Sequence, residues 1–301
     1  RLAATIGTTE ADILARLRRL HGEGKIARVG ATVRPNTAGV STLAALAVRK
    51  ARLDEVARIV SDEPGVNHSY QRENRWNLWF VATAATSEEL AALLARIEAR
   101  TRLPVLNLPL VRAFNIDLGF SLRGPRHAPG SSAPPDLTAL RETDRPLLDA
   151  MSQGLELVPA PFAALATRLG WTEAAVIART AALAAAGILT RVGVIVRHRP
   201  LGWSSNAMVT FEVPEPGIEA AGHALAALPG VTLCYQRRTV PGVWPFGLFC
   251  MIHARTRPEA MAILDSARAL PELRDARHRL LFSERCFKQT GARLAREGQA
   301  A

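Results

Sequence analysis

The feature that most constrains this chain is an internal repeat, in which two long segments align with each other almost without gaps. The segment LAATIGTTEADILARL, which begins at Leu2, matches LATRLGWTEAAVIART, which begins at Leu165, at an offset of 163 residues. Further along, the tripeptide YQR begins at Tyr70 and again at Tyr235, at an offset of 165 residues. This small drift over such a length indicates duplication of one unit, so we expect two related modules.

Each repeat begins with a helical pattern. In the second repeat, a helix over 165–169, a turn at Gly170 and a helix from an N-cap at Thr172 to Ala186 predict a helix-turn-helix. The β-rich segment GILTRVGVIVRH that follows is typical of a wing. This half of each module therefore has the winged helix-turn-helix pattern.

The two repeats differ at their start. The second repeat has a predicted helix over 141–151 in front of its helix-turn-helix, whereas the first repeat begins at the equivalent of Leu165. We therefore expect the natural gene to extend upstream of Arg1, and an initiator codon immediately before Arg1 would contradict this expectation.

A second pattern follows in each repeat, in the order strand, helix, strand, strand, helix, strand. In the first repeat the predicted elements are 40–49, 53–62, 66–72, 76–82, 87–100 and 105–116. This is the order of the ferredoxin-like βαββαβ sandwich, and the second repeat gives it again from residue 206 to about residue 287. The sequence therefore predicts an α+β fold, a tandem repeat of a winged helix-turn-helix domain plus a ferredoxin-like domain of the Lrp/AsnC type.

The boundary between the repeats is marked by the segment RGPRHAPGSSAPPD, whose Pro, Gly and Ser content predicts a linker. We expect the divisions of the chain to be a truncated helix-turn-helix module at 1–36, a ferredoxin-like domain at 37–122, the linker at 123–136, a helix-turn-helix module at 137–200, and a ferredoxin-like domain with a C-terminal tail at 201–301.

The charge of the chain favours a polyanionic partner. The formal net charge is +11, and lysine occurs only at Lys25, Lys50 and Lys288, so arginine carries most of the positive charge. Such a chain attracts nucleic acid, an anionic membrane surface or a small molecule with several carboxylates. The planar fork of arginine suits bidentate binding of carboxylate or phosphate, although a GC-rich genome would produce the same bias.

The cysteines and the hydropathy pattern indicate a soluble, cytoplasmic protein. Cys234, Cys250 and Cys286 are odd in number and lack CxxC spacing, so neither a disulfide framework nor a zinc site is indicated. We find no apolar run of spanning length and no secretory signal, so we expect no contact with a membrane.

The helix-turn-helix carries the wrong charges for reading DNA. In a DNA reader the second helix presents its N-terminal side chains to base edges. Here that end carries Glu10 and Asp12 in the first repeat and Glu173 in the second. Arg16, Arg18 and Arg19 could still contact phosphates. We therefore expect a packing or dimerisation element, without specific DNA binding.

Three segments add a resemblance to a known family. They are PGVNHSYQRENRWNLWF, PGVTLCYQRRTVPGVWPFGLFCMIHA and LLFSERCFKQTGARL. They resemble the siroheme decarboxylases of haem d1 and alternative haem biosynthesis, with the first repeat similar to the D-type subunit and the second similar to the L-type subunit. The resemblance implies a carboxy-lyase that removes carbon dioxide from two acetate arms of siroheme, an iron tetrapyrrole, to give 12,18-didecarboxysiroheme. It implies no cofactor beyond this substrate and no separate metal site.

The first hairpin supplies residues that fit this chemistry. Decarboxylation requires a general acid that protonates the macrocycle or the departing carbon, in a desolvated pocket. His68 and Tyr70 alternate on one strand and are the candidate proton donors, and Arg72 shares their face as a candidate carboxylate anchor. His68 and His198 are also possible ligands of the substrate iron.

The second hairpin repeats the pattern only in part. Tyr235 and Arg237 are candidate catalytic residues, but Leu233 replaces the histidine. The candidate substrate-binding residues across both repeats are Arg72, Arg191, Arg197, His198, Arg238, Trp244 and Lys288. The first hairpin has Asn74 and Trp76 where relatives usually have histidine and tyrosine, so if one half has lost its role, the sequence favours the first.

Simpler interpretations apply to several of these residues. Leu78, Trp79 and Phe80 follow strand period and are expected in the core. Tyr70 and Tyr235 could be structural phenols, His253 could be a satisfied buried ring, and Arg72 could pair with Glu73 across its turn.

The expected partners are siroheme and its decarboxylated products, with sister decarboxylase subunits as a further possibility. We expect the two repeats to pair as an internal pseudo-dimer and leave a homo-oligomer open. The alternative function is a tetrapyrrole-responsive Lrp/AsnC-type transcriptional regulator, which would bind its own upstream DNA in a salt-dependent manner.

Overall fold

The computed structural model describes residues 2–116 and 134–294, and apart from the additional α5 in the second repeat its helices and strands recur in the same order in both repeats. In the first repeat they are α1 (Leu2–Ile6), α2 (Glu10–Gly22), β1 (Ile26–Val33), β2 (Val40–Leu46), α3 (Leu53–Asp62), β3 (Val66–Arg72), β4 (Leu78–Ala84), α4 (Ser87–Thr101) and β5 (Leu106–Ile116). In the second they are α5 (Arg145–Gln153), α6 (Pro161–Leu169), α7 (Glu173–Ala185), β6 (Leu189–Val196), β7 (Ser205–Phe211), α8 (Ile218–Ala227), β8 (Val231–Arg237), β9 (Leu248–Ala254), α9 (Arg257–Arg268) and β10 (His278–Gln289).

Local sequence signals set most of these boundaries. The predicted bounds of α3 and β3 are confirmed, whereas β4 begins at Leu78 and not at Trp76. The reason is a turn in which the Asn74 side chain accepts a hydrogen bond from the Trp76 backbone N–H at 3.0 Å. Most of the predicted linker, 123–133, lies outside the described residues.

The predicted helix-turn-helix of the second repeat is present. The Thr172 hydroxyl accepts a hydrogen bond from the Ala175 backbone N–H at 3.2 Å and caps α7, and Gly170 adopts a φ of +68° in the turn before it. The helix in front starts at Arg145, later than predicted, because residues 142–144 form a 3-10 turn. No helix within 2–116 and 134–294 combines the length and apolar character needed to cross a bilayer.

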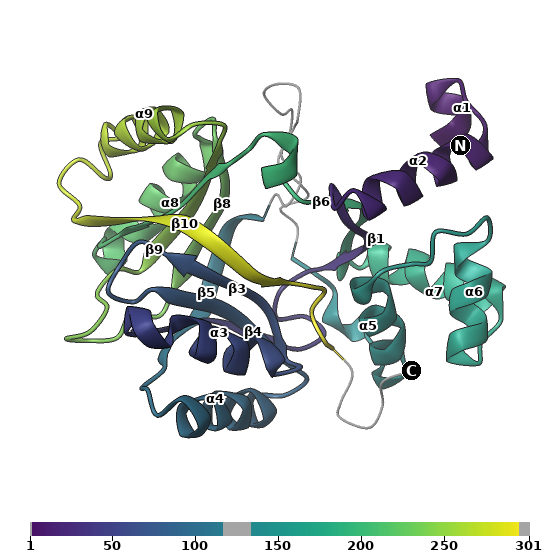
Figure 1. Cartoon of the computed structure of the whole chain (residues 1–301), viewed down its shortest axis with the longest axis horizontal. Coiled ribbons are helices and arrows are strands. Elements are labelled where there is room, and N and C mark those ends of the chain that lie inside the picture. Colours follow the sequence, from purple (N-terminus) through teal and green to yellow (C-terminus); the bar gives the residue numbers. More distant parts are fainter. Residues whose placement is uncertain (1, 117–133, 295–301) are drawn as a thin grey trace.

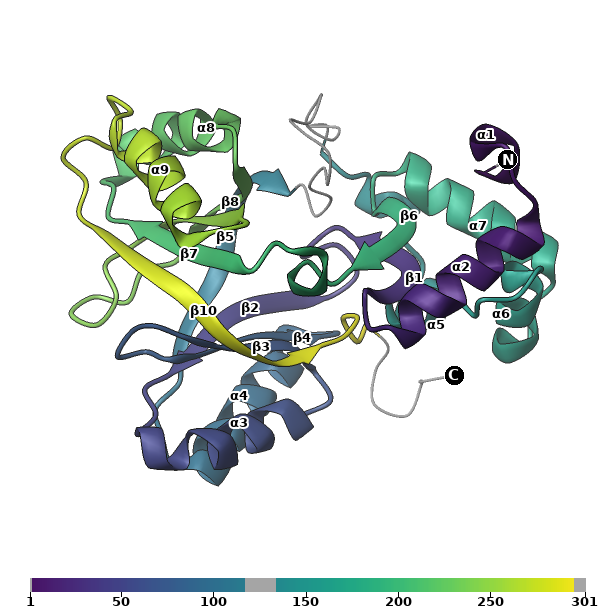
Figure 2. The ribbon, with the colours of Figure 1, turned by 45° about the horizontal axis from the view of Figure 1, so that its top comes forward.

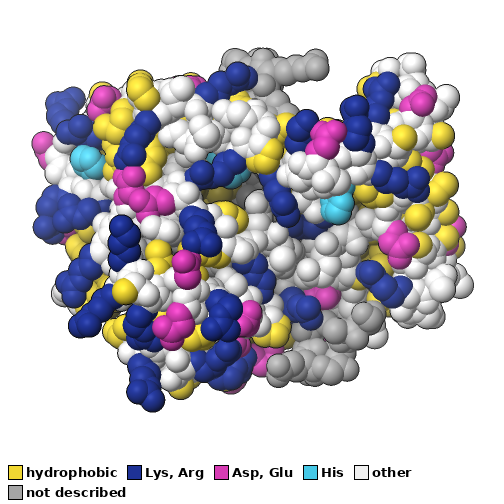
Figure 3. Space-filling model, viewed as in Figure 1, with side chains coloured by type: hydrophobic (Ala, Val, Ile, Leu, Met, Phe, Trp, Pro, Cys, Tyr) yellow, Lys and Arg dark blue, Asp and Glu magenta, His cyan; other side chains and the backbone are white. Residues whose placement is uncertain are grey.

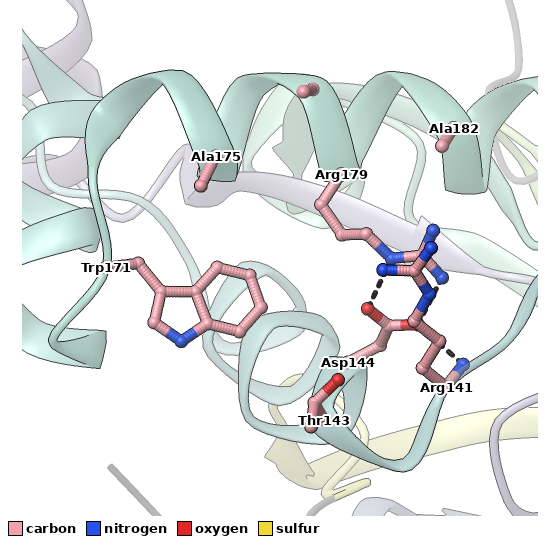
Figure 4. Close-up of a pocket in the computed structure, with 8 residues that line it drawn as sticks. Arg141, Thr143, Asp144, Trp171, Ala175, Arg179 and Ala182 are labelled. Carbon is pink, nitrogen blue, oxygen red and sulfur yellow. Dashed lines mark hydrogen bonds and ion pairs between the residues drawn. The ribbon is translucent and has the colours of Figure 1, made fainter.

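A buried ion pair holds this helical unit together. Figure 4 shows Arg179 of α7 reaching Asp144, which immediately precedes α5, with Nε to Oδ1 at 2.5 Å. The Asp144 carboxylate also accepts the Arg141 backbone N–H at 2.7 Å. Beside this pair lies an open groove of about 510 Å³, which Trp171 and the alanines of α7 line.

The segments expected to form wings instead join the two repeats. β1 pairs with β6 in an antiparallel two-stranded sheet, with Gly30 opposite Gly193. Each repeat contributes one strand to this sheet, so the backbone groups of β1 form hydrogen bonds with those of β6 in the other repeat. Because Thr32 pairs with Arg191 and Arg28 is four residues before Thr32 on β1, Arg28 and Arg191 lie on the same face of this sheet.

The ferredoxin-like halves close into one barrel with the strand order β10-β3-β4-β2-β5-β8-β9-β7. The last strand of each repeat crosses the junction: β5 pairs with β2 and then with β8, and β10 pairs with β7 and then with β3. In Figure 1, α3 and α4 cover one side of the barrel and α8 and α9 cover another. Figure 2 shows β1 and β6 between the barrel and the helical end. The α+β tandem fold is confirmed, and the repeats pair internally.

The barrel interior is an apolar core shared by the two repeats. Its buried members are Ala45, Trp79, Leu106, Leu108, Met208, Trp244, Phe246, Phe249 and Leu281. Leu78 and Phe80 face the opposite side and pack with α3 and α4, so the expectation that these strand residues are core is confirmed. Both repeats contribute to this core, so neither sheet exposes its apolar inner face to water.

Candidate functional site

Three predicted residues of β3 lie on one face of their strand. The Ser69 hydroxyl lies 2.9 Å from the Ser61 hydroxyl of α3, so Ser69 faces the helices, and His68, Tyr70 and Arg72 alternate with it. They therefore face the barrel interior, near the end of the barrel that adjoins the β1–β6 sheet. Figure 3 shows a hollow in this region, surrounded by Lys and Arg side chains with a histidine at its rim.

His68 and Tyr70 form a contacting pair. The Tyr70 hydroxyl lies 3.4 Å from His68 Nδ1, and the two rings are nearly parallel with centroids 6.2 Å apart. Cys286 of β10 is directly opposite Tyr70 in the β10–β3 pairing. The Arg72 guanidinium lies 5.5 Å from the centroid of the Tyr70 ring. These contacts assemble an imidazole, a phenol and a guanidinium at one place.

Arg72 is a buried cation. Its side chain donates from Nη1 to Asn206 Oδ1 and to the Leu281 carbonyl, both at 3.3 Å. Its Nε is buried and has no hydrogen-bond partner among the described residues. Burial lowers the pKa of Arg72 to about 10, so the group stays charged at neutral pH. The expected pair with Glu73 is wrong, because Glu73 instead forms an ion pair with Arg257.

Two further histidines adjoin Arg72. His253 of β9 has Asn206 Nδ2 at 2.6 Å from its Nε2 and the Thr232 hydroxyl at 2.8 Å from its Nδ1. The His198 ring meets the His253 ring nearly edge-on, with centroids 5.0 Å apart. The expectation that His253 is a satisfied ring is confirmed, because both ring nitrogens have partners, and the side chain is half-buried. The site residues that sequence reasoning missed are Asn206 and Cys286, whose only sequence signal is their strand alternation.

Burial sets the protonation of this cluster. It lowers the pKa of His68 to about 4, helped by the charge of Arg28, and lowers that of His198 to about 4, helped by Arg199. Burial also lowers the pKa of His253 to about 3 and raises that of Tyr70. Near neutral pH the site therefore contains neutral imidazoles and a protonated phenol beside positive arginines.

These pKa shifts predict a loss of stability in acid. The folded pKa values of the three rings lie below the ordinary value of 6.5, so the unfolded chain binds more protons between about pH 4 and 6.5. Their contribution is fully present above that window and is lost as the pH falls through it. We expect the free energy of unfolding to fall by up to ~1 kcal/mol per pH unit for each ring. Urea unfolding at a series of pH values measures the free energy of unfolding as a function of pH. This free energy should depend less steeply on pH between about pH 4 and 6.5 in His68→Gln than in the parent, and an equal dependence would contradict this account.

The second hairpin occupies a different environment. The Arg237 guanidinium lies 5.3 Å from the Tyr235 ring and donates from Nη1 to the Leu108 carbonyl at 3.1 Å. Its Nε is also buried without a partner among the described residues. Trp244 is buried in the barrel core, where its ring meets the Trp79 ring at 5.3 Å. This hairpin therefore offers a half-buried guanidinium without an imidazole from β8.

The strand registers allow the two hairpins to be compared position by position. Tyr70 pairs with Trp79, and Tyr235 pairs with Phe249, so these pairs correspond. The positions that differ in chemistry are His68 and Leu233, Cys286 and Ala113, His253 and Thr83, and Asn206 and Ser41. The surroundings of Tyr70 and Arg72 therefore include imidazole, thiol and amide groups, contributed by β3 and by strands of the second repeat, where the surroundings of Tyr235 and Arg237 have apolar or hydroxyl groups. The duplicated fold contains two unequal sites.

The remaining predicted residues are dispersed. Arg191 shares the sheet face of Arg28, which lies close enough to His68 to affect its pKa, and Arg197 lies close enough to affect the pKa of Cys286. Arg238 is exposed on the second hairpin. Lys288 donates to the carbonyls of Ser61 at 2.6 Å and Glu63 at 3.1 Å. The structure thus does not bring Arg238, Trp244 or Lys288 into the His68 cluster.

A family model described as the AsnC-like ligand binding domain matches residues 37–115 and 200–288, which are the two ferredoxin-like halves. This match defines the class of protein. A model described as the siroheme decarboxylase NirDL-like HTH domain matches residues 144–189. The siroheme decarboxylase NirDL subunit of Paracoccus denitrificans is 62% identical over 98% of this chain and 90% of its own length. The chain belongs to the siroheme decarboxylase family.

Two further relatives agree with this assignment. The siroheme decarboxylase NirD subunit of Pseudomonas aeruginosa is 51% identical over 42% of this chain and 84% of its own length. The crystal structure of the siroheme decarboxylase NirDL in co-complex with an iron-uroporphyrin III analogue has a TM-score of 0.67 and 27% identity, covering 97% of this chain and 87% of that chain. These similarities favour the decarboxylase over the regulator alternative.

Proposed function

We propose that this protein is a carboxy-lyase that converts siroheme to 12,18-didecarboxysiroheme, with the first hairpin as its working site. The observation that carries this proposal is the pairing of a buried arginine, whose Nε is open, with neutral imidazoles on one side of the duplicated fold only. A buried cation with an unused donor is suited to a carboxylate. Family membership names siroheme as the source of that carboxylate.

The chemistry divides between the arginines and the neutral groups. In each decarboxylation the bond between the acetate methylene and its carboxylate breaks, the electron pair enters the macrocycle, and a proton converts the methylene to a methyl group. A cation bound to the reacting carboxylate would stabilise the starting state and slow this step. We therefore assign Arg72 to a neighbouring arm, and assign the reacting acetate to His68 and Tyr70.

The two ring nitrogens of His68 have different roles in this proposal. We assign the Tyr70 hydroxyl, which stays protonated, as the donor to Nδ1, and this assignment places the hydrogen of the neutral ring on Nε2. When the ring takes up a proton at Nδ1 or from solvent to become the imidazolium, its Nε2–H is the proton source for the departing carbon, and the transfer leaves the neutral ring. Siroheme has many carboxylates, and their negative charge offsets the positive charge of Arg28. Bound siroheme therefore favours protonation of His68.

The choice of the first hairpin reverses the expectation from Asn74 and Trp76. Asn74 bonds to the Trp76 backbone N–H, and the Trp76 carbonyl accepts from the indole N–H of Trp79 at 2.5 Å. Both residues therefore shape the turn. Their departure from the usual pattern alters the hairpin end and leaves the pair of His68 and Tyr70 in place.

The test of the function is anaerobic incubation of the purified chain with siroheme. We expect release of carbon dioxide and a doubly decarboxylated product by mass spectrometry. Activity of the isolated chain would show that no sister subunit is needed, and activity only after such a subunit is added would assign this chain a shared site. Unchanged siroheme under full occupancy in both mixtures would refute the proposal.

A matched pair of tyrosine variants tests which hairpin works. We expect Tyr70→Phe to slow carbon dioxide release about tenfold at saturating siroheme, because the His68 ring loses a hydrogen bond that fixes it. Tyr235→Phe should remain within about threefold of the parent, because it has no histidine partner on its strand. Single-turnover release rates measure both, and a larger effect of Tyr235→Phe would move the working site to the second hairpin.

A further inference from the structure

Four residues on four strands form one continuous chain of hydrogen bonds behind the site. Arg72 of β3 reaches Asn206 of β7, which reaches His253 of β9, which reaches Thr232 of β8. Arg72 and Asn206 are 134 residues apart, so this chain exists only because the two repeats close into a barrel. Asn206 is 7% exposed and is its central link.

The direction of every bond in this chain is fixed by its first member. A guanidinium only donates, so the Asn206 side-chain oxygen accepts from Arg72 and its amide N–H donates to His253 Nε2 at 2.6 Å. His253 Nε2 is therefore the nitrogen without hydrogen. Nδ1 then carries the hydrogen and donates to Thr232, whose hydroxyl donates to the Met251 carbonyl at 3.1 Å. An amide accepts at its oxygen and donates at its nitrogen, so these two separate atoms let Asn206 bridge the guanidinium and this ring nitrogen.

The corresponding position in the other repeat lacks this function. Ser41 corresponds to Asn206, and its backbone N–H donates to the Asn36 side chain at 3.1 Å. Arg237 has its own backbone acceptor, the Leu108 carbonyl, just as Arg72 has the Leu281 carbonyl. The hydrogen bond to a side-chain amide therefore distinguishes Arg72 from Arg237, since both also donate to a backbone carbonyl. It occurs on the side that also has the histidines.

We propose that Asn206 is a positioning residue with two roles. It holds the Arg72 guanidinium toward the substrate carboxylate, and it fixes the tautomer of the neutral His253 ring, which packs against His198. The proposal rests on the proposed function, because the carboxylate is taken to be a siroheme arm. With the Arg72 Nη1 tied to Asn206 and Leu281, the Nε remains open for that arm. With both ring nitrogens bonded, His253 supports the edge of the His198 ring and does not exchange protons with substrate.

Substitutions at residue 206 separate positioning from simple packing. Asn206→Asp keeps the shape but places a carboxylate against Arg72 and reverses the bond to His253, so the ring must carry hydrogen on Nε2. We expect siroheme to bind ~100-fold more weakly, because the buried aspartate competes with the substrate arm for the guanidinium. Asn206→Ser reproduces the residue of the other repeat, and we expect a loss of ~10-fold. Ser41→Ala is the matched control and should bind siroheme as the parent does.

The readout beyond binding is the tautomer of His253. Long-range proton–nitrogen NMR spectra of the full chain without siroheme should show hydrogen on Nδ1 alone in the parent, and His253→Gln identifies the signals by their absence. We expect Asn206→Asp to place hydrogen on Nε2. A parent ring with hydrogen on Nε2, or folded Asn206→Ser protein with an unchanged His253 signal and an affinity within twofold of the parent, would overturn the proposal.

The outcomes remain decisive if one variant or the wider function fails. If Asn206→Asp does not fold, the parent tautomer and the Asn206→Ser protein decide the question alone. If the parent binds siroheme without releasing carbon dioxide, the proposed function fails, but the tautomer and affinity comparisons still test the role of Asn206.

Discussion

Replacement of His68 by glutamine is expected to slow carbon dioxide release by ~100-fold or more at saturating siroheme. Glutamine keeps a polar side chain of similar reach but cannot donate and recover a proton. We expect the dissociation constant for siroheme to stay within about threefold, because the carboxylate arms are bound by the arginines. Single-turnover rates and equilibrium titration measure the two quantities separately.

The matched control for His68 is Leu233, its equivalent on the second hairpin. Leu233→Ala should leave the single-turnover rate within about threefold of the parent, since leucine transfers no proton. Equal rates for His68→Gln and the parent would assign proton transfer to another group and remove His68 from the mechanism.

Replacement of Arg72 by methionine is expected to weaken siroheme binding by ~100-fold, which corresponds to about 3 kcal/mol for a charge-assisted, bidentate contact. The same change should leave the free energy of unfolding unchanged or slightly higher. Arg72 is only 6% exposed, and methionine removes the cost of burying its charge. Titration with siroheme and urea unfolding test the two halves of this prediction.

Two further variants define the Arg72 result. Arg72→Lys should recover little affinity, because an ammonium lacks the planar fork. Arg238→Ala removes an exposed arginine of the second hairpin and should bind siroheme as the parent does. A protein that loses stability but keeps its affinity in Arg72→Met would show that this guanidinium is a structural group and not a substrate anchor.

The elements that could be predicted closely are those whose causes lie within a few residues. The bounds of α3 and β3 follow from short-range periodicity, and the cap at Thr172 follows from a hydroxyl three residues before the N–H that it accepts. His68, Tyr70 and Arg72 were likewise placed on one face, because strand alternation is local. The repeat itself was visible because duplication leaves two copies of the same pattern in one chain.

The elements that could not be predicted depend on partners far away in the chain. Lys288 looks like a free cation in the sequence, yet it bonds to two carbonyls more than 220 residues earlier. Asn206 has no motif around it, and its role depends on Arg72 from the other repeat. No local pattern encodes such contacts, because they arise only when the last strand of each repeat crosses to the other.

The sequence by itself determined the duplicated α+β architecture, the family and the His68, Tyr70 and Arg72 face, because periodicity, capping and motifs are short-range properties. Only the tertiary structure decided that β1 pairs with β6, that the barrel is shared, and that His198, His253 and Asn206 meet Arg72 on one side. The physical reason is barrel closure, which brings strands of opposite repeats into hydrogen-bonding register and buries their polar side chains together. Barrel closure therefore brings His198, Asn206 and His253 of the second repeat to Arg72 of the first. The surroundings of Arg72 thereby differ in chemistry from those of Arg237, its equivalent in the second repeat.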